Sequence, residues 1–276
     1  MKKISRRSFM AAAAVSVAAL AMTACGGSAS SAASSVASSA ASSEAASAAA
    51  ELTTVEAGKL TMATNATFPP YEMTTDAGTI EGIDVDTAKA IAEKLGLELQ
   101  IDDMDFDAAL LSVQQGKADI VMAGVTVTDE RKAVMDFSDS YATGIQSIIV
   151  PEGSDIATPD DLAGKKIGTQ RGTTGYIYCS DDFGDENVVA YDSGLTAVQA
   201  LNNGQVDAVV IDNEPAKAYV ESNPGLKILD TSYAEEDYAI GMAKGSALED
   251  AINAALEELK ADGTLQTIVD KYITAE

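Results

Sequence analysis

Two apolar segments of the chain are each followed by residues that could hold a polar ligand. Gly124 and Thr126 come after the apolar run 120–123, and Asp212 comes after the run 209–211. A glycine leaves its backbone open to a ligand, a hydroxyl can donate or accept a hydrogen bond, and a carboxylate accepts hydrogen bonds from cations. Arg131 follows the first run closely, and a planar guanidinium can bind a carboxylate through two parallel hydrogen bonds. These residues could therefore bind small charged groups.

The residue types that the sequence lacks exclude several other kinds of chemistry. Histidine is absent, so the chain has no Ser–His–Asp or Cys–His catalytic unit and no imidazole-bound zinc or iron. There are two cysteines and no calcium-binding loop of the EF-hand type, and we expect no metal and no cofactor. The 43 Asp and Glu against 18 Lys and Arg give a formal charge of −25, which repels nucleic acids and anionic membranes. We interpret most of these acids as a solvated surface.

Strands and helices alternate along residues 52–276. Apolar residues predict strands at 59–63 and 97–101, and helical spacing predicts a helix over 85–95 that ends at Gly96. A second helix is predicted over 106–113. This alternation is typical of an α/β sheet with mainly parallel strands.

The segment 112–123 resembles the later segment 200–211. Each contains the end of a helix, a glycine, an aspartate and a buried strand, in that order. The repeat predicts two similar α/β lobes. Because ligands bind beyond the carboxyl ends of strands in open α/β sheets, we expect Gly124, Thr126 and Asp212 to face one cleft.

Residues 1–24 predict a signal peptide that is cleaved before Cys25. Basic residues without any acid precede an apolar run that is too short for a stable membrane span. The small residues before Cys25 resemble a bacterial lipobox, which predicts a lipid-anchored cysteine and leaves Cys179 unpaired. The segment 5–10 (SRRSFM) also resembles a twin-arginine export motif, so the export route stays open between the general and the twin-arginine pathways. Residues 25–51 are then the lipidated cysteine and a flexible tether rich in Ala and Ser.

Several motifs, in the same order along the chain, are similar to those of one known family. They are 64–72 (TNATFPPYE), 82–86 (GIDVD), 123–132 (AGVTVTDERK), 136–138 (DFS) and 171–175 (RGTTG). On these motifs the chain resembles the polar amino-acid-binding proteins of ABC importers, the extracellular solute-binding family 3, over essentially all of residues 52–276. The resemblance implies two α/β lobes joined by two hinge strands, as in type II periplasmic binding proteins. Lobe 1 would comprise residues 52–146 plus 236–276, and lobe 2 residues 147–235.

The resemblance also implies roles for residues in the cleft between the lobes. Arg131 would bind the α-carboxylate of an amino acid, helped by the Gly124 amide and by the hydroxyls of Thr126 and Thr174. Asp212 would accept hydrogen bonds from the α-ammonium group. With Arg131 and Asp212 in opposite lobes, a zwitterion can engage both only when the cleft closes.

The residues themselves allow other interpretations of three of these positions. Arg131 could form a surface ion pair with Asp129 or Glu130. Asp212 could be the N-cap of a helix, and so could Thr174.

The side chain of the ligand would meet a second set of residues. The resemblance places Phe68 and Phe106 as aromatic walls, although both could instead belong to the apolar core. Asn65 stands where many relatives carry Asp, and a neutral amide weakens the case for a cationic ligand. Arg171 could offer positive charge to an acidic or amide ligand.

The expected protein is a substrate-binding lipoprotein, held outside the membrane by its lipid anchor and monomeric. It would capture an L-amino acid, expected to be polar, and deliver it to an ABC transporter permease driven by a separate ATPase. Two other functions stay open on the sequence. One is a secreted enzyme on the same scaffold, similar to the cyclohexadienyl (prephenate or arogenate) dehydratases. Such an enzyme needs a positioned acid or base, and no acid–base pair stands out in the sequence, so we expect no enzyme. The other is a sensory ligand-binding domain. The segment 270–276 leads into no membrane span, and this counts against a sensory role.

Overall fold

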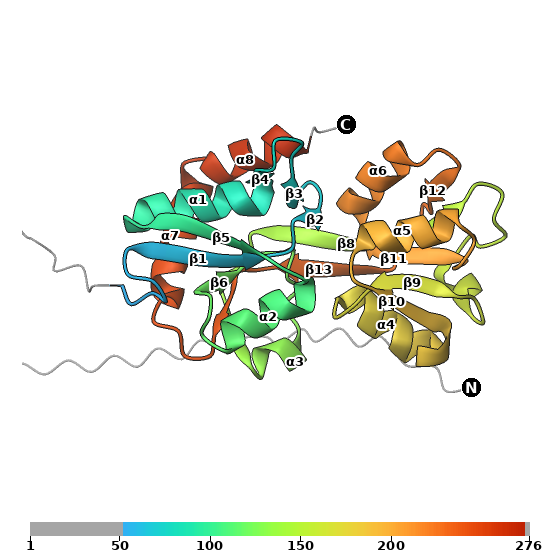
Figure 1. Cartoon of the computed structure of the whole chain (residues 1–276), viewed down its shortest axis with the longest axis horizontal. Helices are drawn as coiled ribbons and strands as arrows, with labels where there is room; N and C mark the ends of the chain where they lie inside the picture. The colour runs from blue at the N-terminus through green and yellow to red at the C-terminus, as the bar shows by residue number, and fades with distance from the viewer. Residues whose placement is uncertain (1–51, 274–276) are drawn as a thin grey trace, which may run out of the picture. The chain divides into compact units, whose positions relative to one another are not determined.

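The structure is a computed structural model that describes residues 52–273 (Figure 1). The predicted signal peptide 1–24, Cys25 and the predicted tether lie outside these residues, as do the last three residues of the chain. The described part contains two large sheets flanked by helices, which we call lobe 1 and lobe 2. Both lobes lie within one compact unit of the chain.

Lobe 1 is built on a five-stranded sheet with the strand order β5-β1-β6-β14-β7. The strands are β1 (Lys59–Thr64), β5 (Glu98–Asp103), β6 (Ile120–Val121), β7 (Met135–Phe137) and β14 (Gly241–Ala243). The helices are α1 (Ile83–Leu95), α2 (Phe106–Gln114), α3 (Asp129–Lys132), α7 (Glu249–Ala261) and α8 (Thr264–Tyr272). A small sheet of β2 (Thr67–Phe68), β3 (Glu72–Thr74) and β4 (Ile80–Glu81) connects β1 to α1.

Lobe 2 is built on a sheet with the order β10-β9-β11-β8-β12, in which β13 also pairs with β8. The strands are β8 (Ala142–Pro151), β9 (Ile167–Gln170), β10 (Val188–Tyr191), β11 (Ala208–Asp212), β12 (Leu226–Ile228) and β13 (Ala234–Tyr238). The helices are α4 (Thr174–Phe183), α5 (Gly194–Asn202) and α6 (Asn213–Ser222), with short 3₁₀ turns at Pro159–Leu162 and Asp185–Asn187.

The two sheets share one topology. In each, the first strand of the lobe (β1 or β9) lies in parallel between the second and the third. The third strand (β6 or β11) then pairs with an antiparallel strand that arrives from the other lobe, β14 in lobe 1 and β8 in lobe 2. That strand pairs in turn with the fourth strand of the lobe, β7 or β12. Long antiparallel pairing of β8 with β13 carries the chain between the lobes (Figure 1). The predicted fold, two similar α/β lobes joined by two hinge strands, is confirmed, whereas the boundaries at 146/147 and 235/236 stay predictions.

The internal repeat in the sequence corresponds to a repeated structure. Its first copy spans α2 and β6, and its second copy spans α5 and β11. The aspartate before each third strand has the same task, because Asp119 accepts a hydrogen bond from Thr61 N in β1 and Asp207 accepts one from Lys166 N beside β9, both at 2.8 Å. These aspartates fix the third strand of each lobe to the first.

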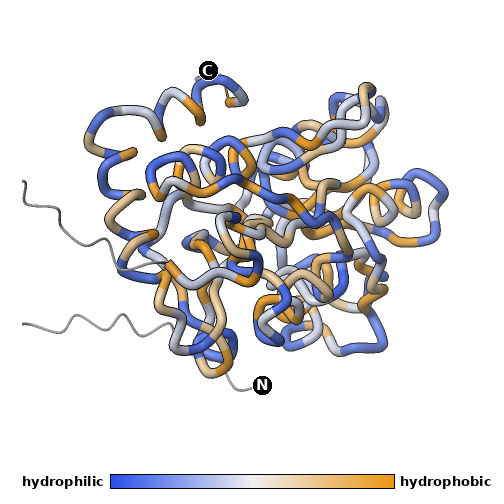
Figure 2. The backbone as a smooth tube through the Cα atoms, turned by 60° about the vertical axis from the view of Figure 1, so that its left-hand side comes forward, coloured by the Kyte–Doolittle hydropathy of each residue, from blue (hydrophilic) through white to orange (hydrophobic). Residues whose placement is uncertain are grey.

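The element ends predicted from local sequence signals agree closely with those in the structure. The predicted helix over 85–95 is α1, and it ends where Gly96 adopts a left-handed conformation with φ of 70° that favours glycine. The strand predicted at 97–101 lies slightly later, as β5. Each lobe buries apolar residues on both faces of its sheet, and the outer helices alternate between hydrophilic and apolar residues along their length (Figure 2). Within residues 52–273, no helix combines the length and the hydropathy needed to cross a bilayer.

Candidate functional site

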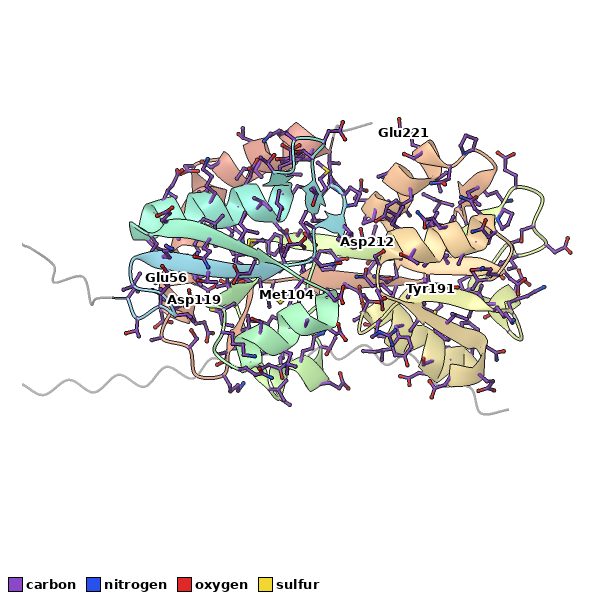
Figure 3. All side chains as sticks on the ribbon, viewed as in Figure 1. Glu56, Met104, Asp119, Tyr191, Asp212 and Glu221 are labelled. Atoms are coloured by element: carbon purple, nitrogen blue, oxygen red, sulfur yellow. The ribbon has the colours of Figure 1, made fainter. Side chains whose placement is uncertain are left out.

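A cavity lies between the lobes, where strands of both sheets end. All eight residues that the sequence predicted as ligand-binding line it: Asn65, Phe68, Phe106, Gly124, Thr126, Arg131, Thr174 and Asp212. Figure 3 shows Asp212 near the junction of the lobes, whereas Glu56 and Glu221 lie at the periphery. The cavity volume is about 30 Å³, which is room for a water molecule or two. The lobes must therefore separate before a larger ligand can enter.

Arg131 lies in the wall of this cavity. It belongs to the short helix α3, and its side chain is only 8 % exposed. One guanidinium nitrogen donates to Thr126 O at 2.7 Å and the other to Gly172 O, across the cleft, at 3.1 Å. The guanidinium carbon lies 5.4 Å from the centre of the Phe106 ring, which supports it from one side. Burial lowers the pKa of Arg131, because a buried cation loses its hydration.

The alternative interpretation of Arg131 as a surface ion-pairing residue is wrong. Asp129 and Glu130 lie in the same helix, but neither forms an ion pair with Arg131, and among residues 52–273 its guanidinium donates to two backbone carbonyl oxygens. A guanidinium has five N–H groups, so donors remain for a further acceptor. The site holds a buried positive charge without a direct anionic partner.

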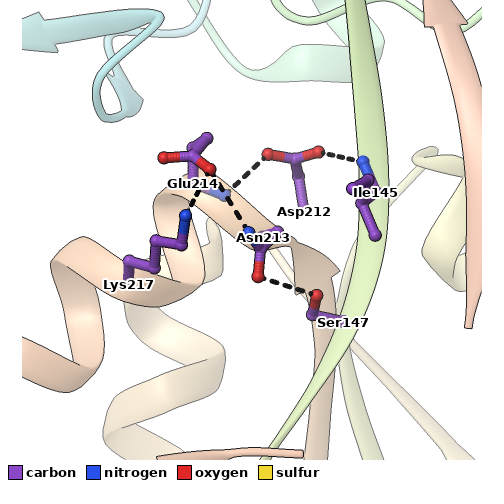
Figure 4. A network of polar contacts seen from close by, with 6 residues as sticks. All are labelled: Ile145, Ser147, Asp212, Asn213, Glu214 and Lys217. Carbon is purple, nitrogen blue, oxygen red and sulfur yellow. Dashed lines mark hydrogen bonds and ion pairs between the residues drawn. The ribbon is translucent and has the colours of Figure 1, made fainter. Parts of the chain in front are cut away.

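Asp212 lies on the lobe 2 side of the cavity at the end of β11. One carboxylate oxygen accepts a hydrogen bond from Glu214 N at 3.0 Å, and the other accepts from Ile145 N at 2.8 Å (Figure 4) and from the Tyr238 hydroxyl at 2.9 Å. Asp212 is thus the N-cap of α6, and the same carboxylate lines the cavity. Burial raises the pKa of Asp212 to about 6, while the three hydrogen bonds oppose that shift. With three donors in place, one lone-pair site of the carboxylate is still open.

The two predicted hydroxyl groups meet across the cleft. Thr126 Oγ1 and Thr174 Oγ1 are 3.4 Å apart, and both side chains are buried. The interpretation of Thr174 as an N-cap is wrong, because Thr173 caps α4 by accepting from Tyr176 N. Thr174 is the first residue of the helix, which leaves its hydroxyl free to face lobe 1.

Gly124 lines the cavity in a different way from the one that we expected. Its N–H donates to Asp84 Oδ2 at 2.9 Å, so this amide is already bonded and does not point a free donor at a ligand carboxylate. The glycine is needed because a Cβ atom here would lie 2.8 Å from Phe68 Cε1 and 3.2 Å from Tyr238 Cε2, at a φ of +55°. Its role is to let two aromatic rings approach the backbone.

The two phenylalanines line the cavity and also belong to the apolar packing of the protein. Phe106 is 6 % exposed and is part of the lobe 1 core. Phe68 is half-buried, stacks on Tyr71 with ring centres 5.6 Å apart, and packs against apolar residues of both lobes. For Phe106 the core interpretation and the cavity-wall interpretation therefore both hold.

The amide of Asn65 makes three hydrogen bonds to other groups of the protein. Its oxygen accepts from the Thr67 hydroxyl and from Gln170 Nε2, both at 2.9 Å, and its nitrogen donates to Met104 O at 2.9 Å. Asn65 lines the cavity, but two of these hydrogen bonds hold it within lobe 1 and the third, from Gln170, joins it to lobe 2.

Two residues singled out in the sequence lie away from the cavity. Arg171 is half-exposed and pairs with Asp192 at 3.3 Å, so the idea that it offers positive charge to a ligand is wrong. Cys179 is buried in α4 as a free cysteine, as expected, and burial raises the pKa of its thiol to about 12.

The most informative residue that sequence reasoning missed is Glu72. It lines the cavity and is fully buried, and neither of its carboxylate oxygens has a hydrogen-bond partner within residues 52–273. Burial raises its pKa well above the usual range, and the nearby carboxyl of Asp84 raises it further. The sequence shows Glu72 only as one residue of a motif, because nothing local tells that a glutamate in a three-residue strand is buried.

A second buried carboxylate, Glu236 on β13, lies behind the cavity. One oxygen accepts from the Thr126 hydroxyl at 3.0 Å and from Gln146 Nε2 at 2.9 Å, and the other has no partner among the described residues. Its negative charge favours the charged form of Arg131. Within residues 52–273, no group of three or more Asp, Glu or Cys side chains is arranged to hold a metal ion.

This fold and cavity define a class of two-lobed binding proteins, and comparisons with known proteins agree. The model of the bacterial extracellular solute-binding proteins, family 3, matches residues 60–275. The chain belongs to this family. It is 33 % identical to a probable histidine-binding protein of Neisseria gonorrhoeae, over 96 % of this chain and 95 % of that protein.

Two solved structures show the same fold with bound amino acids. One is an ancestral arginine-binding protein bound to glutamine, with 44 % identity and a TM-score of 0.76 over 79 % of this chain and 99 % of that one. The other is an amino acid ABC transporter substrate-binding protein, AbpA of Streptococcus pneumoniae, bound to L-arginine. It has 37 % identity and a TM-score of 0.73 over 78 % of this chain and 94 % of that one. These relatives are amino-acid-binding proteins and not enzymes.

Proposed function

We propose that this protein is the substrate-binding lipoprotein of an ABC importer, and that it captures a cationic L-amino acid outside the membrane. The amino acid would lie in the cavity between the lobes and pass unchanged to a membrane permease. The observation that carries the proposal is the buried guanidinium of Arg131, which has no ion-pair partner within residues 52–273 and shares one cavity with the carboxylate of Asp212.

A zwitterion complements this pair of charges. The α-carboxylate would take the remaining donors of Arg131 and the hydroxyl of Thr174, and the α-ammonium group would take the open lone-pair site of Asp212. Removing a charge from water is costly unless it is paired, so each end of the ligand would compensate a buried charge of the protein.

Glu72 supports a positive charge on the ligand side chain. Once Arg131 and Asp212 are matched by the α-groups, Glu72 is left as a fully buried carboxyl without a hydrogen-bond partner among residues 52–273. A positive charge beside it would lower its raised pKa and favour the ionised form. A guanidinium, ammonium or imidazolium group would supply both a charge and hydrogen-bond donors. The named ligands of relatives support the same class, since they include arginine and histidine, although the glutamine-bound ancestral structure shows that related cavities also take a neutral amide.

The ligand class is tested by calorimetry with matched compounds. L-Arginine, L-lysine and L-histidine should bind more tightly than L-glutamine, and agmatine, which is arginine without its carboxylate, should bind at least about 100-fold more weakly than arginine. Equal affinities for arginine and agmatine would contradict the role of Arg131. Mass spectrometry of the recovered ligand distinguishes a binding protein, which returns it unchanged, from an enzyme on this scaffold.

Anchoring is a separate part of the proposal and depends on Cys25. The exchange Cys25→Ser removes the only thiol in the lipobox-like sequence, so we expect loss of lipid labelling and release of the protein or retention of the precursor. Amino-acid binding should be unchanged, because the tether separates the anchor from the lobes. The Cys179→Ser variant is the matched control, and it should still incorporate the lipid label.

A further inference from the structure

Residues 65–68 of lobe 1, which we call the closure segment, receive two hydrogen bonds from lobe 2. Gln170 Nε2, at the end of β9, donates to Asn65 Oδ1 at 2.9 Å. The hydroxyl of Tyr219, on α6, donates to the carbonyl oxygen of Thr67. The two donors come from different elements of lobe 2, so the closure segment is held at two points.

The closure segment is also fixed firmly to lobe 1. Asn65 Nδ2 donates to Met104 O at 2.9 Å, and Ala66 N donates to Asp103 Oδ1, at the end of β5, at 2.8 Å. A hydrogen bond from lobe 2 to this segment therefore connects lobe 2 to the main sheet of lobe 1 rather than to a loose loop.

Tyr219 makes its contact without belonging to the cavity. It does not line the cavity that contains Arg131 and Asp212, and its ring packs in the apolar core of lobe 2 with 7 % exposure. It follows the N-cap residue Asp212 by seven positions, which is about two helical turns, so both lie on the same side of α6. A movement of lobe 2 that brings Asp212 to a ligand also brings the Tyr219 hydroxyl to Thr67.

We propose that Tyr219 is a positioning residue that slows ligand release by holding the two lobes together, without touching the ligand. This inference rests on the proposed function in one respect, that an amino acid binds between the lobes. The hydrogen bond joins groups in different lobes, so it exists only while the cleft is closed. It therefore stabilises the closed state relative to the open state, in which water satisfies both groups.

The expected size of the effect follows from the usual net value of such a bond. Replacing Tyr219 by Phe keeps the packed ring and removes only the donor, which should raise the ligand dissociation rate about 3- to 10-fold. The association rate and the order of preference among amino acids should not change, because no residue that contacts the ligand is altered.

The first measurement is stopped-flow dissociation of the ligand that binds best in the calorimetric panel, for wild type and Tyr219→Phe. The control is Tyr233→Phe, which also loses a tyrosine hydroxyl bond, but one that the half-buried Tyr233 makes to Asp182 within lobe 2 at 2.6 Å. A residue that only stabilises lobe 2 would lower the unfolding temperature without changing the release rate. The control variant should behave in that way.

The second measurement needs no ligand. Spin labels placed at Leu111→Cys on α2 and Leu195→Cys on α5, both exposed positions in different lobes, report the distance between the lobes by electron–electron double resonance. Tyr219→Phe should shift this distance distribution toward longer distances, and Tyr233→Phe should leave it unchanged. The labelling is selective because Cys179 is fully buried and the variants are made in the Cys25→Ser background.

The two measurements separate failure of this inference from failure of the proposed function. If no amino acid binds, the proposed function fails, and the ligand-free distances still test the closing role of Tyr219. If Tyr219→Phe matches wild type in both the release rate and the distance distribution, the positioning role is wrong. An equal acceleration of release in Tyr219→Phe and Tyr233→Phe would also overturn it.

Discussion

Lobe 1 and lobe 2 share a strand order but present different chemistry at matching positions. Gly124 and Asp212 occupy the same place in the internal repeat, just beyond the third strand of each sheet. In lobe 1 this position is a backbone N–H bonded to Asp84, and in lobe 2 it is a carboxylate that caps α6. The repeated scaffold therefore builds the cleft, and the residues past the strand ends make it asymmetric.

The lobes also differ in how well their buried charges are satisfied. Among residues 52–273, Asp212 of lobe 2 accepts three hydrogen bonds, whereas Glu72 of lobe 1 accepts none and Arg131 of lobe 1 bonds only to carbonyl oxygens. Buried charges without partners are costly. Lobe 1 thus holds the buried ionisable groups that a ligand is most needed to pair, and lobe 2 supplies a preorganised acceptor.

The largest expected effect is that of removing the lobe 1 cation. Arg131→Ala leaves the α-carboxylate of a bound amino acid without its main partner, which should cost about 2–5 kcal/mol, or roughly 30- to several-thousand-fold in affinity. Arg131→Lys should recover only part of this loss, because a point charge replaces a two-pronged donor. Calorimetry gives the affinities, and circular dichroism should show an unchanged fold.

The matched control for that prediction is Arg171→Ala. Arg171 is a half-exposed arginine of lobe 2 whose ion pair with Asp192 contributes little, so its removal should change affinity less than about twofold. An Arg131→Ala protein with full affinity would remove the carboxylate assignment and, with it, the division of roles between the lobes.

The exchange Glu72→Gln tests the second difference between the lobes, which is how well their buried ionisable groups are satisfied. It keeps the shape of the side chain but removes the carboxyl that a cationic ligand would ionise, so affinity for L-arginine should fall about 10- to 100-fold, while affinity for L-glutamine should change much less. Glu221→Gln, at an exposed position of lobe 2, is the control and should bind both ligands as wild type does. Equal losses for arginine and glutamine would show that Glu72 supports the cavity rather than selecting a cation.

The smallest effect is a pH dependence with opposite signs for binding and for stability. Burial raises the pKa of Asp84 in lobe 1 and of Asp212 in lobe 2 to about 6 each. Binding of an ammonium group needs ionised Asp212, so affinity at pH 5 should be about 10-fold lower than at pH 7.5. Calorimetry at the two pH values measures this change.

The ligand-free protein should instead become more stable as the pH falls over the same range. Because the folded pKa values of Asp84 and Asp212 lie above their unfolded values, the folded state binds more protons between about pH 4 and 6. Stability is therefore gained as the pH falls through 6 and lost as it rises again. Thermal unfolding of ligand-free protein at pH 7.5 and pH 5 checks the sign, and a lower midpoint at pH 5 would contradict it.

The sequence by itself determined the repeated scaffold and half of the residues that line the cavity. Helix ends at glycines, the alternation of strand and helix, and the repeat predicted two α/β lobes, because these signals depend only on neighbouring residues. The resemblance of the motifs to those of a known family predicted one site for eight residues, and all eight line the cavity. These residues occupy similar positions in the chain relative to the ends of strands. Such positions can be read directly from a sequence.

Only the tertiary structure decided which polar groups are buried and which are already bonded. It shows that the Gly124 amide donates to Asp84, that the Asn65 amide accepts a hydrogen bond from lobe 2, and that Glu72 is buried without a hydrogen-bond partner among the residues described. None of these facts has a local signal. The burial and the partners of a side chain depend on segments distant in sequence, and those segments meet only when both lobes have folded and closed on each other.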